Sequence, residues 1–454
     1  MRIAKERVCA LTLFVILAGV LSAPAQRLDG DLSGEVKDGH GLAVAGAKVT
    51  ITNQSQGTKK GLETTDAGTF FVPNLLPGLY KIEVEQSGFR KLVKPDVQVI
   101  ANRLAEVRLV LELGAISETL TVEAGAQLVD TQTVTLANTF VGEELHSPAL
   151  AQGGGITGNL INLAILAPGT TTQPGGVAGT GGAIGGNRPR NNSFTVDGLD
   201  NNNSSVTGES APVIAEAVKE FTLLTNQFSA EYGHSTAGQF IQTTKSGTNQ
   251  VHGNAWWYNQ NRHLNSLDNL NANKFVGKDP PRFDANRLGG QAGGPIIHDR
   301  WFYFGAFEYR NLGQAGVSSS TTLVPTQAGL TTLQTLSTTP GTGVSPVAVK
   351  ILTDHVPPAA TASTSARICN EAVSGSCNAA ATVNIPVGAS NAIAPQYLFA
   401  PLFLVSSDYE TSRNKLSARY HYSRQRSIAA GAFPAPEFNS PQIFDTRRVT
   451  ISDA

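Results

Sequence analysis

Few residues of this chain have the types and spacing that catalysis or metal binding requires. Asp197, Glu231 and His234 come closest, because carboxylates near a histidine can form an acid–base pair or ligate a metal. His234 has no second histidine at ligand spacing, so we interpret all three as ordinary polar residues. The first 113 residues contain no paired carboxylates, no Ser/His/Asp arrangement and no zinc-ligand set. We therefore predict no catalytic residue, no metal, no cofactor and no enzymatic activity.

The start of the chain has the three parts of a cleavable signal peptide. Basic residues at positions 2, 5 and 7 precede an uncharged apolar run from Val8 to Leu21, and Ala23 and Ala25 supply the small residues that a signal peptidase recognises. An uncleaved membrane anchor is the alternative, but the run is shorter than the roughly 20 residues that span a bilayer. We therefore assign residues 1–25 to a signal peptide that is cleaved after Ala25.

Composition and charge favour an exported β-protein. Beyond Leu21, no stretch approaches the roughly 18 consecutive apolar residues of a membrane-spanning helix. A membrane protein with this sequence would have to be a barrel, since only helices and closed barrels satisfy their backbone groups in lipid. The 46 glycines and the 15% of charged residues suit a mainly β fold with many turns. The net charge of −1 argues against nucleic acid as a partner.

Two cysteines remain after signal cleavage, Cys369 and Cys377, in a segment rich in Ser, Ala and Asn. In an oxidising compartment, a pair this close predicts a local disulfide. Its entropic stabilisation would be modest, at or below about 3 kcal/mol, because the closed loop is short. A metal site is the alternative, but no histidine or further cysteine lies nearby.

Residues 26–113 alternate with the rhythm of short β-strands. Apolar and polar residues alternate over 47–52, 80–85 and 107–111, and glycine-containing turn clusters separate these runs. Roughly seven short strands with regular turns predict a β-sandwich. The side chains that we expect to face its core are those of Phe70, Val72, Leu79, Ile82 and Val84.

The same region resembles a known domain. The segments GEVKDGHGLAVAGAKVTITN and TTDAGTFFVPNLLPGLYKIEVEQSGF are similar to the carboxypeptidase regulatory-like domain, and this resemblance implies a transthyretin-like sandwich. It does not imply peptidase activity, because function does not follow from fold. Two roles stay open for the domain, a structural or docking accessory and a direct ligand-binding module.

A short acidic and hydrophobic segment follows within residues 114–124. It contains Glu118, Thr119, Leu120, Thr121 and Val122, and it resembles the TonB box of TonB-dependent receptors. The resemblance implies a TonB-type energy-coupling protein in the periplasm as partner. The alternation of Leu120 and Val122 with threonines would permit strand addition. The alternative is a plain linker strand or the last strand of the sandwich.

Residues 125–246 contain three ordered pieces that resemble the plug domain of TonB-dependent receptors. They are the Asp197-Gly198 turn after an apolar strand, Tyr232-Gly233, and Gly238 before an apolar strand that ends in Thr-Lys-Ser-Gly. Gln239–Gln242 departs from the usual Gly-Val-Ile-Asn and suits the Oar-like branch, in which a regulatory-like sandwich precedes the plug. The resemblance implies an α+β plug. Within it, residues 213–221 are expected to form a short amphipathic helix that leads into a strand.

From residue 247 onward the pattern predicts an antiparallel transmembrane β-barrel. Residues 256–258 form an aromatic cluster typical of an interfacial girdle, and 286–297 pairs with 301–309 across a tight turn. Leu416, Ala418, Tyr420 and Tyr422 are expected to share one face of a later strand. The Thr/Ser/Ala/Pro-rich stretch of about 313–398 is interpreted as a large surface loop.

We count four to six barrel strands in 247–454, whereas the barrels of such transporters use 22. The expectation is therefore a fragment that holds only part of the barrel and lacks the usual terminal aromatic residue.

The sequence thus predicts an outer-membrane TonB-dependent transport receptor. The alternative is a surface or secreted adhesion protein that binds carbohydrate through the sandwich. The expected partners are the energy-coupling protein, outer-membrane lipid and an extracellular ligand, with carbohydrate and peptide as open classes. The sequence does not identify the ligand.

Overall fold

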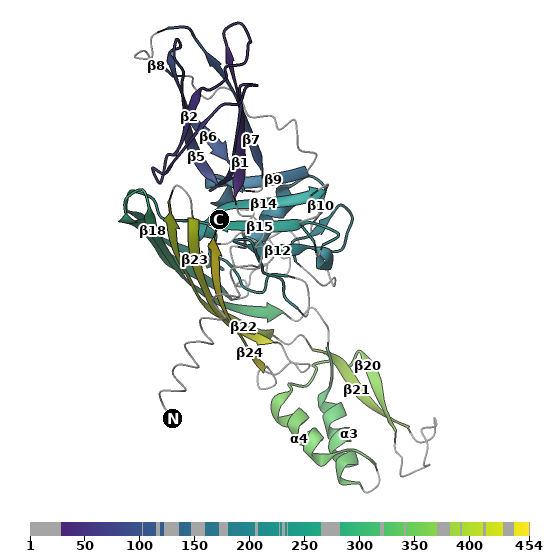
Figure 1. Ribbon diagram of the computed structural model, residues 1–454. Coiled ribbons are helices and arrows are strands. Elements are labelled where there is room, and N and C mark those ends of the chain that lie inside the picture. The colour runs from purple at the N-terminus through teal and green to yellow at the C-terminus, as the bar shows by residue number, and fades with distance from the viewer. Residues whose placement is uncertain are drawn as a thin grey trace, which may run out of the picture.

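The computed structural model consists of a β-sandwich, a plug domain, a curved β-sheet and a small α/β segment (Figure 1). The curved sheet, formed by strands within residues 252–317 and 393–453, is called the wall. The α/β segment within residues 322–390 is called the excursion. None of the helices described is long and apolar enough to cross a membrane. The residues that the structure describes are 29–101, 103–114, 119–121, 136–146, 159–171, 180–204, 208–226, 228, 232–233, 235–264, 282–317, 322–339, 342–369, 382–390, 393–411, 415–429 and 440–453.

The N-terminal sandwich has two sheets. The smaller has the order β4-β1-β7, and the larger has the order β3-β2-β5-β6-β8. The strands are β1 (Gly30–Asp38), β2 (Lys48–Asn53), β3 (Lys59–Glu63), β4 (Thr69–Leu75), β5 (Gly78–Glu85), β6 (Lys91–Val99), β7 (Leu104–Leu111) and β8 (Thr119–Thr121). The prediction of roughly seven short strands is therefore confirmed.

The alternation of apolar and polar residues predicted most of the sandwich core correctly. Phe70, Val72, Ile82 and Val84 are all buried, but Leu79 is 46% exposed, so that prediction was wrong. Successive side chains of a strand point to opposite faces, and in β5 the inward face begins at Tyr80.

The plug domain is a five-stranded sheet with short 3₁₀ turns around it. The strand order is β13-β12-β15-β14-β9. Its elements are β9 (Leu136–Val141), η2 (Gly142–His146), η4 (Leu160–Leu166), β10 (Thr170–Thr171), β11 (Ala183–Ile184), η5 (Pro189–Asn191), β12 (Ser193–Val196), β13 (Leu199–Asp200), η6 (Ala215–Ala217), β14 (Val218–Asn226) and β15 (Gln239–Thr244). The helix expected at 213–221 is reduced to η6, because β14 already pairs with β15 from Val218.

Six antiparallel strands form the wall in chain order, in agreement with the four to six predicted. They are β16 (His252–Asn261), β17 (Phe283–Ile297), β18 (Trp301–Val317), β22 (Ile393–Glu410), β23 (Lys415–Ala429) and β24 (Ser440–Asp453). The predicted hairpin of β17 and β18 is confirmed, with Ile297 opposite Trp301. β16 and β24 lie at the two ends of this sheet, so the described strands do not close a barrel.

The wall strands β18 and β23 each present two chemically different faces. In β18, Phe302, Phe304 and Ala306 are buried against the plug side, while Trp301 and Tyr303 point outward and are partly exposed. In β23, Leu416 and Tyr420 are exposed outward, and the alternate residues face inward, as predicted. The aromatic cluster at 256–258 is split by this alternation, since Trp256 is buried and Trp257 is 71% exposed.

The stretch of about 313–398 is not the featureless surface loop that we expected. β18 and β22 extend into both of its ends, and the part between them folds with a small core that includes Leu333, Val349 and Ile385. Its elements are β19 (Thr322–Pro325), α3 (Gln327–Thr338), α4 (Pro346–His355), β20 (Thr364–Cys369) and β21 (Thr382–Ser390). Thr326 and Ser345 cap the two helices through side-chain oxygens, which satisfies free amides of the first turns.

The domains are arranged along one axis. The sandwich lies at one end, the plug sheet and the wall lie side by side in the middle, and the excursion lies at the other end (Figure 1). The plug therefore faces the inner surface of the wall.

Candidate functional site at the plug and barrel wall

A buried charged network joins the plug to the wall. Alternation places Glu308 and Arg310 on the same inner face of β18, and the antiparallel register places Arg287 of β17 directly opposite Arg310. The Arg287 guanidinium contacts Glu308 at 2.9 Å, and Arg310 contacts the same carboxylate at 2.5 Å. From the plug, Glu216 in η6 accepts two hydrogen bonds from Arg287, at 3.0 and 2.8 Å.

Most polar atoms of the network have partners, although Arg287 Nε is buried without one among the residues that the structure describes. Trp256 donates its indole N–H to Glu308 at 3.0 Å, and Arg310 donates to the Val213 carbonyl of the plug at 3.1 Å. Two guanidiniums and two carboxylates balance in charge, which is the condition under which burial is tolerated. Burial raises the pKa of Glu216, with Arg287 opposing the shift and Glu308 adding to it.

An apolar seam runs beside these charges. Ile214 and Ala217 of the plug pack in one cluster with side chains from the wall strands. The wall members of that cluster include Trp256, Phe304, Ala306, Leu398, Ala400, Leu402 and Leu404. The plug is thus held by a small apolar contact together with polar links.

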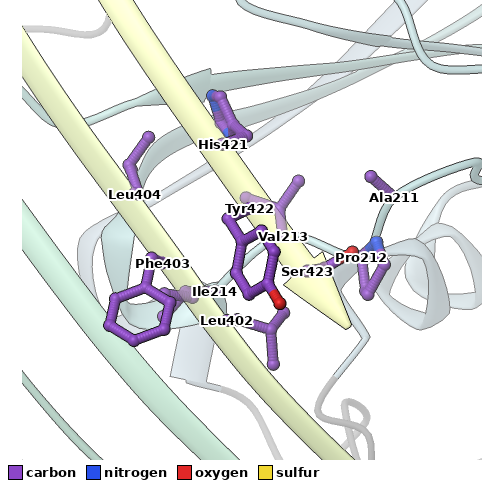
Figure 2. Close-up of a pocket in the computed structure, with 10 residues that line it drawn as sticks. All are labelled: Ala211, Pro212, Val213, Ile214, Leu402, Phe403, Leu404, His421, Tyr422 and Ser423. Carbon is purple, nitrogen blue, oxygen red and sulfur yellow. The ribbon is translucent and has the colours of Figure 1, made fainter. Parts of the chain in front are cut away.

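A small pocket interrupts the seam further along (Figure 2). It lies between the plug segment 211–214 and strands β22 and β23. Its wall side is lined by Leu402, Phe403, Leu404, His421, Tyr422 and Ser423. The plug therefore does not fill the inner surface of the wall completely at this point.

The Asp197-Gly198 turn makes a second polar link to the wall. Both residues have positive φ, +49° and +73°, as the tight connection from β12 to β13 requires. The Asp197 carboxylate accepts from the amide and hydroxyl of Thr244, at 2.9 and 2.8 Å, and lies 3.3 Å from His421 Nε2. Burial alone would raise the pKa of Asp197, but the His421 hydrogen bond and the nearby Arg419 charge outweigh it and lower the pKa.

The remaining predicted plug residues gather around β15. Gln239 at its start donates to the Gly233 carbonyl at 3.0 Å and lies 3.5 Å from the Tyr232 carbonyl, whereas Asp197 binds Thr244 at its end. Gly238 is tightly enclosed, because an added Cβ would lie 2.2 Å from Ile184 Cδ1. The three motif pieces are thus tied together by one strand.

Glu231, His234, Cys377, Glu118, Val122 and the signal peptide lie outside the described residues. Cys369 ends β20, and the disulfide remains a prediction. Within the described part of the chain, no group of three or more His, Cys, Asp or Glu residues could hold a metal ion.

The TonB-box-like segment is described only at Thr119–Thr121. These residues form β8, which pairs in parallel with Lys91–Val93 of β6. The segment therefore occupies the position of an added edge strand on the sandwich, the alternative that its sequence left open. Its use in energy coupling remains a prediction.

The sandwich contacts both the plug and the wall, which sequence analysis did not predict. Gln56 donates to Gly247 at 3.2 Å, and Asn249 bonds both the Gln56 carbonyl and Asp299 of the β17–β18 turn, each at 2.6 Å. Asp29 forms an ion pair with Lys415 at the start of β23. On the plug side, the Ala101 amide donates to Glu220 at 3.4 Å. Polar residues at turns carry no periodic signal, so sequence alone could not reveal this docking.

Glu220 should make this docking depend on pH. Burial raises the pKa of Glu220 to about 7, above its ordinary 4.5. Because this pKa is raised, the protonated Glu220 carboxyl stabilises docking fully below pH 4.5. That stabilisation is lost as the pH rises through 7 and the carboxyl ionises. We expect docking to weaken by roughly 1–2 kcal/mol between pH 5 and 8. The weakening of docking can be measured as a loss of protection from amide hydrogen exchange around Ala101, after correction for the pH dependence of intrinsic exchange rates.

Glu220→Gln is the matched variant for that measurement. It keeps the shape and the hydrogen-bonding capacity but cannot ionise, so its exchange protection should lack the pH dependence that comes from residue 220. The difference between the two proteins cancels the contribution of neighbouring Lys219. Equal pH profiles for both proteins would contradict the assignment to Glu220.

The described part of the chain thus combines an N-terminal sandwich, a plug-like sheet and an open antiparallel wall. Two sequence families match the chain. The "Outer membrane beta barrel domain" matches residues 243–454, and the "Carboxypeptidase regulatory-like domain" matches residues 31–112.

The chain is a homologue of the TonB-dependent transporter Oar of Myxococcus xanthus. The two are 26% identical over 310 residues, which is 66% of this chain and 29% of the relative. The chain thus spans less than a third of that relative's length. That relative is described as a transporter.

Solved structures of lower similarity also align with the chain. The ferric enterobactin receptor PfeA from Pseudomonas aeruginosa is 14% identical, with 65% of this chain and 33% of that chain covered and a TM-score of 0.36. The outer membrane transporter YddB from Escherichia coli is 10% identical, with 64% and 39% covered and a TM-score of 0.36.

Proposed function

We propose that this chain is the plug-bearing part of an outer-membrane TonB-dependent transport receptor. The observation that carries the proposal is the buried link from Glu216 of the plug to Arg287 and Glu308 of the inner wall. Such a link holds a plug in register while it remains breakable, because water that enters a loosened seam can solvate the separated charges. No catalytic role is proposed for any residue.

In this proposal, energy coupling acts through the segment around 118–122. A periplasmic TonB-type protein would pair with it by strand addition, and a pull on the chain would then reach the plug. The alternative of a secreted adhesion protein needs the aromatic hairpins to form a soluble sandwich. Instead, the six wall strands form one sheet with exposed apolar side chains such as Phe403 and Val405 on its outer face.

Cysteine crosslinking tests the coupling segment. With Leu120→Cys, we expect disulfide capture of a cysteine-bearing periplasmic domain of the energy-coupling protein. Lys59→Cys is the matched control, because β3 and β8 are the two edges of the same sheet. Capture at position 120 should exceed the control by about five-fold or more, since strand addition selects one segment.

The outcomes separate two failures. Equal capture at both positions, with the protein in the outer-membrane fraction, would contradict coupling through this segment. Recovery of the protein in the soluble periplasm would contradict the transport proposal as a whole.

A further inference from the structure

The N-terminal sandwich bridges the joint between the plug and the wall. Figure 1 shows it at one end of the molecule, next to both the plug sheet and the wall. Its docking end consists of the start of β1, the β2–β3 turn and the residues around Pro77 and Ala101. Through this end it contacts three different parts: the plug, the linker 245–251 that joins the plug to the wall, and the wall itself.

On the plug, the sandwich holds two adjacent residues at the start of β14. Lys219 donates its ammonium to the Pro77 carbonyl, and Glu220 accepts from the Ala101 amide at 3.4 Å. Both sandwich partners are backbone groups, so their positions are set by the fold rather than by flexible side chains. The held end of β14 directly follows η6, whose Glu216 enters the buried charged network with the wall.

The linker is pinned on two sides. Toward the wall, Gly247 approaches so closely that an added Cβ would lie 2.3 Å from a backbone oxygen of β18. Toward the sandwich, Gln56 donates to the Gly247 carbonyl at 3.2 Å and to the Ser246 hydroxyl at 3.3 Å. The Asn249 amide donates to the Ser55 carbonyl at 3.0 Å. A plug that moved away from the wall would displace this linker, so the pinned linker resists that movement.

On the wall, the sandwich holds two separate strand ends. Asp29 forms an ion pair with Lys415 at the start of β23, and the two side chains are only 8% and 13% exposed. An ion pair that is shielded in this way is screened less by water and salt than a surface pair. The Asp299 amide of the β17–β18 turn donates at 2.8 Å to Asn249, which itself contacts the sandwich.

A body that holds two others raises the free energy needed to separate them. To leave the wall, the plug must break the apolar seam and the charged network. It must also break either its own contacts with the sandwich or those between the sandwich and the wall. A sandwich that stays docked on both keeps the plug at a high effective concentration beside the wall. Undocking removes this contribution and leaves the seam and the network as they are.

We propose that the docked sandwich is a lock that holds the plug against the wall, and that it must undock before the plug can move. The movement itself rests on the proposed function, whereas the lock is a property of the folded chain and can be measured without a transported ligand. The position of the coupling segment agrees with this order of events. Thr119–Thr121 pair with β6, so a pull on them reaches the sandwich sheet before it reaches the plug.

Amide hydrogen exchange at the seam of the detergent-extracted full chain tests the lock. The readout is the exchange of plug residues 214–217, which lie against the wall. Asp29→Asn/Gln56→Ala removes the ion pair and the side-chain contacts with the linker, and it leaves the seam residues unchanged. Exchange at 214–217 should be at least about five-fold faster than in the native chain, because contacts that oppose local opening are lost.

Asp66→Asn/Gln86→Ala is the matched control. It makes the same chemical changes at the opposite end of the sandwich, where Gln86 donates to the Ala45 carbonyl, and its seam exchange should equal that of the native chain. Exchange of β2 and β5 in the sandwich core should match the native chain in both double variants, which shows that the sandwich remains folded.

A chemical tether tests the lock in the opposite direction. Asp29→Cys/Lys415→Cys is prepared with Cys369 and Cys377 replaced by serine, and is joined by a short bismaleimide. Without the crosslinker, its seam exchange should be faster than in the native chain. With the crosslinker, exchange should return to the native rate or below it, because the sandwich is again held on the wall.

Seam exchange that is unchanged in Asp29→Asn/Gln56→Ala, or equal in the tethered and untethered proteins, would overturn the lock and leave the transport proposal intact. Recovery of the native chain outside the outer-membrane fraction would contradict the transport proposal. The expected differences in seam exchange would still support the lock in that case, so the two failures are distinguishable.

Discussion

Replacement of Glu308 by Gln should destabilise the assembled plug and wall by about 3–5 kcal/mol. Glu308 is fully buried and receives Arg287, Arg310 and the Trp256 indole on one carboxylate. The amide keeps the shape but removes the charge, which leaves two buried guanidiniums with Glu216 alone. Denaturant unfolding of the detergent-extracted chain measures the loss, with tryptophan fluorescence as a local signal from Trp256.

Two further variants test whether the stability loss of Glu308→Gln comes from the buried charged network. Glu63→Gln makes the same chemical change on the exposed strand β3 and should alter stability by less than about 0.5 kcal/mol. Glu216→Gln should cost less than Glu308→Gln, because Arg287 would keep Glu308 as a partner. If Glu308→Gln and Glu63→Gln had equal effects, the network would not hold the two parts together.

Asp197→Asn should be the second most damaging change, with a loss of about 2–4 kcal/mol. Asparagine tolerates the positive φ of this turn, so the backbone is kept and only the charge is removed. The lost charge faces His421 and Arg419 on the wall, and the new amide would place a donor where Asp197 accepts from Thr244 or His421. Hydrogen exchange of β15 and the unfolding midpoint report the change.

The pH dependence of Asp197 follows from its lowered pKa. Its contribution is fully present above the ordinary value of 3.8 and is lost only as pH falls through the lower folded value. Native and Asp197→Asn proteins should therefore converge in stability below pH 3.8 and differ most at neutral pH. A constant difference across the whole range would refute the role of this carboxylate. Asp197→Ala should cost more than Asn, because alanine is less well tolerated at φ +49°.

Much of the fold could be predicted because its signals are local. Period-two alternation identified the sandwich strands and the β17–β18 hairpin, since a strand with one buried face must alternate. The same rule placed Leu416 and Tyr420 on the outer face of β23. Leu79 was misplaced because a one-residue error in phase moves a side chain to the opposite face.

The excursion was missed because its signals are weak. Five of the residues in α3 are Thr or Ser, which are poor helix formers, and its apolar positions are few. Its stability comes from a core that joins Leu333 and Val349 to Ile385, and such a contact between distant segments leaves no local pattern.

The charged network could not be derived from sequence for a related reason. Glu216 and Arg287 are far apart in the chain and meet only when the plug lies against the wall. One signal was available, the inward pair Glu308 and Arg310 in an otherwise aromatic strand. Charges on the inner face of a wall strand need partners, and this requirement points to a charged surface opposite.

The excursion also bears on the order in which the wall forms. β18 and β22 are joined by residues 318–392, so pairing them directly would close a long and entropically costly loop. Within the excursion, Thr322 already pairs with Ser390, and this contact brings the two strand ends together. If the excursion folds first, the loop that remains to be closed between β18 and β22 shortens to the few residues outside the Thr322–Ser390 pair. The entropic cost of closing the loop then falls by roughly 2 kcal/mol. The excursion would thus act as a preformed nucleus that sets the register of the two neighbouring wall strands.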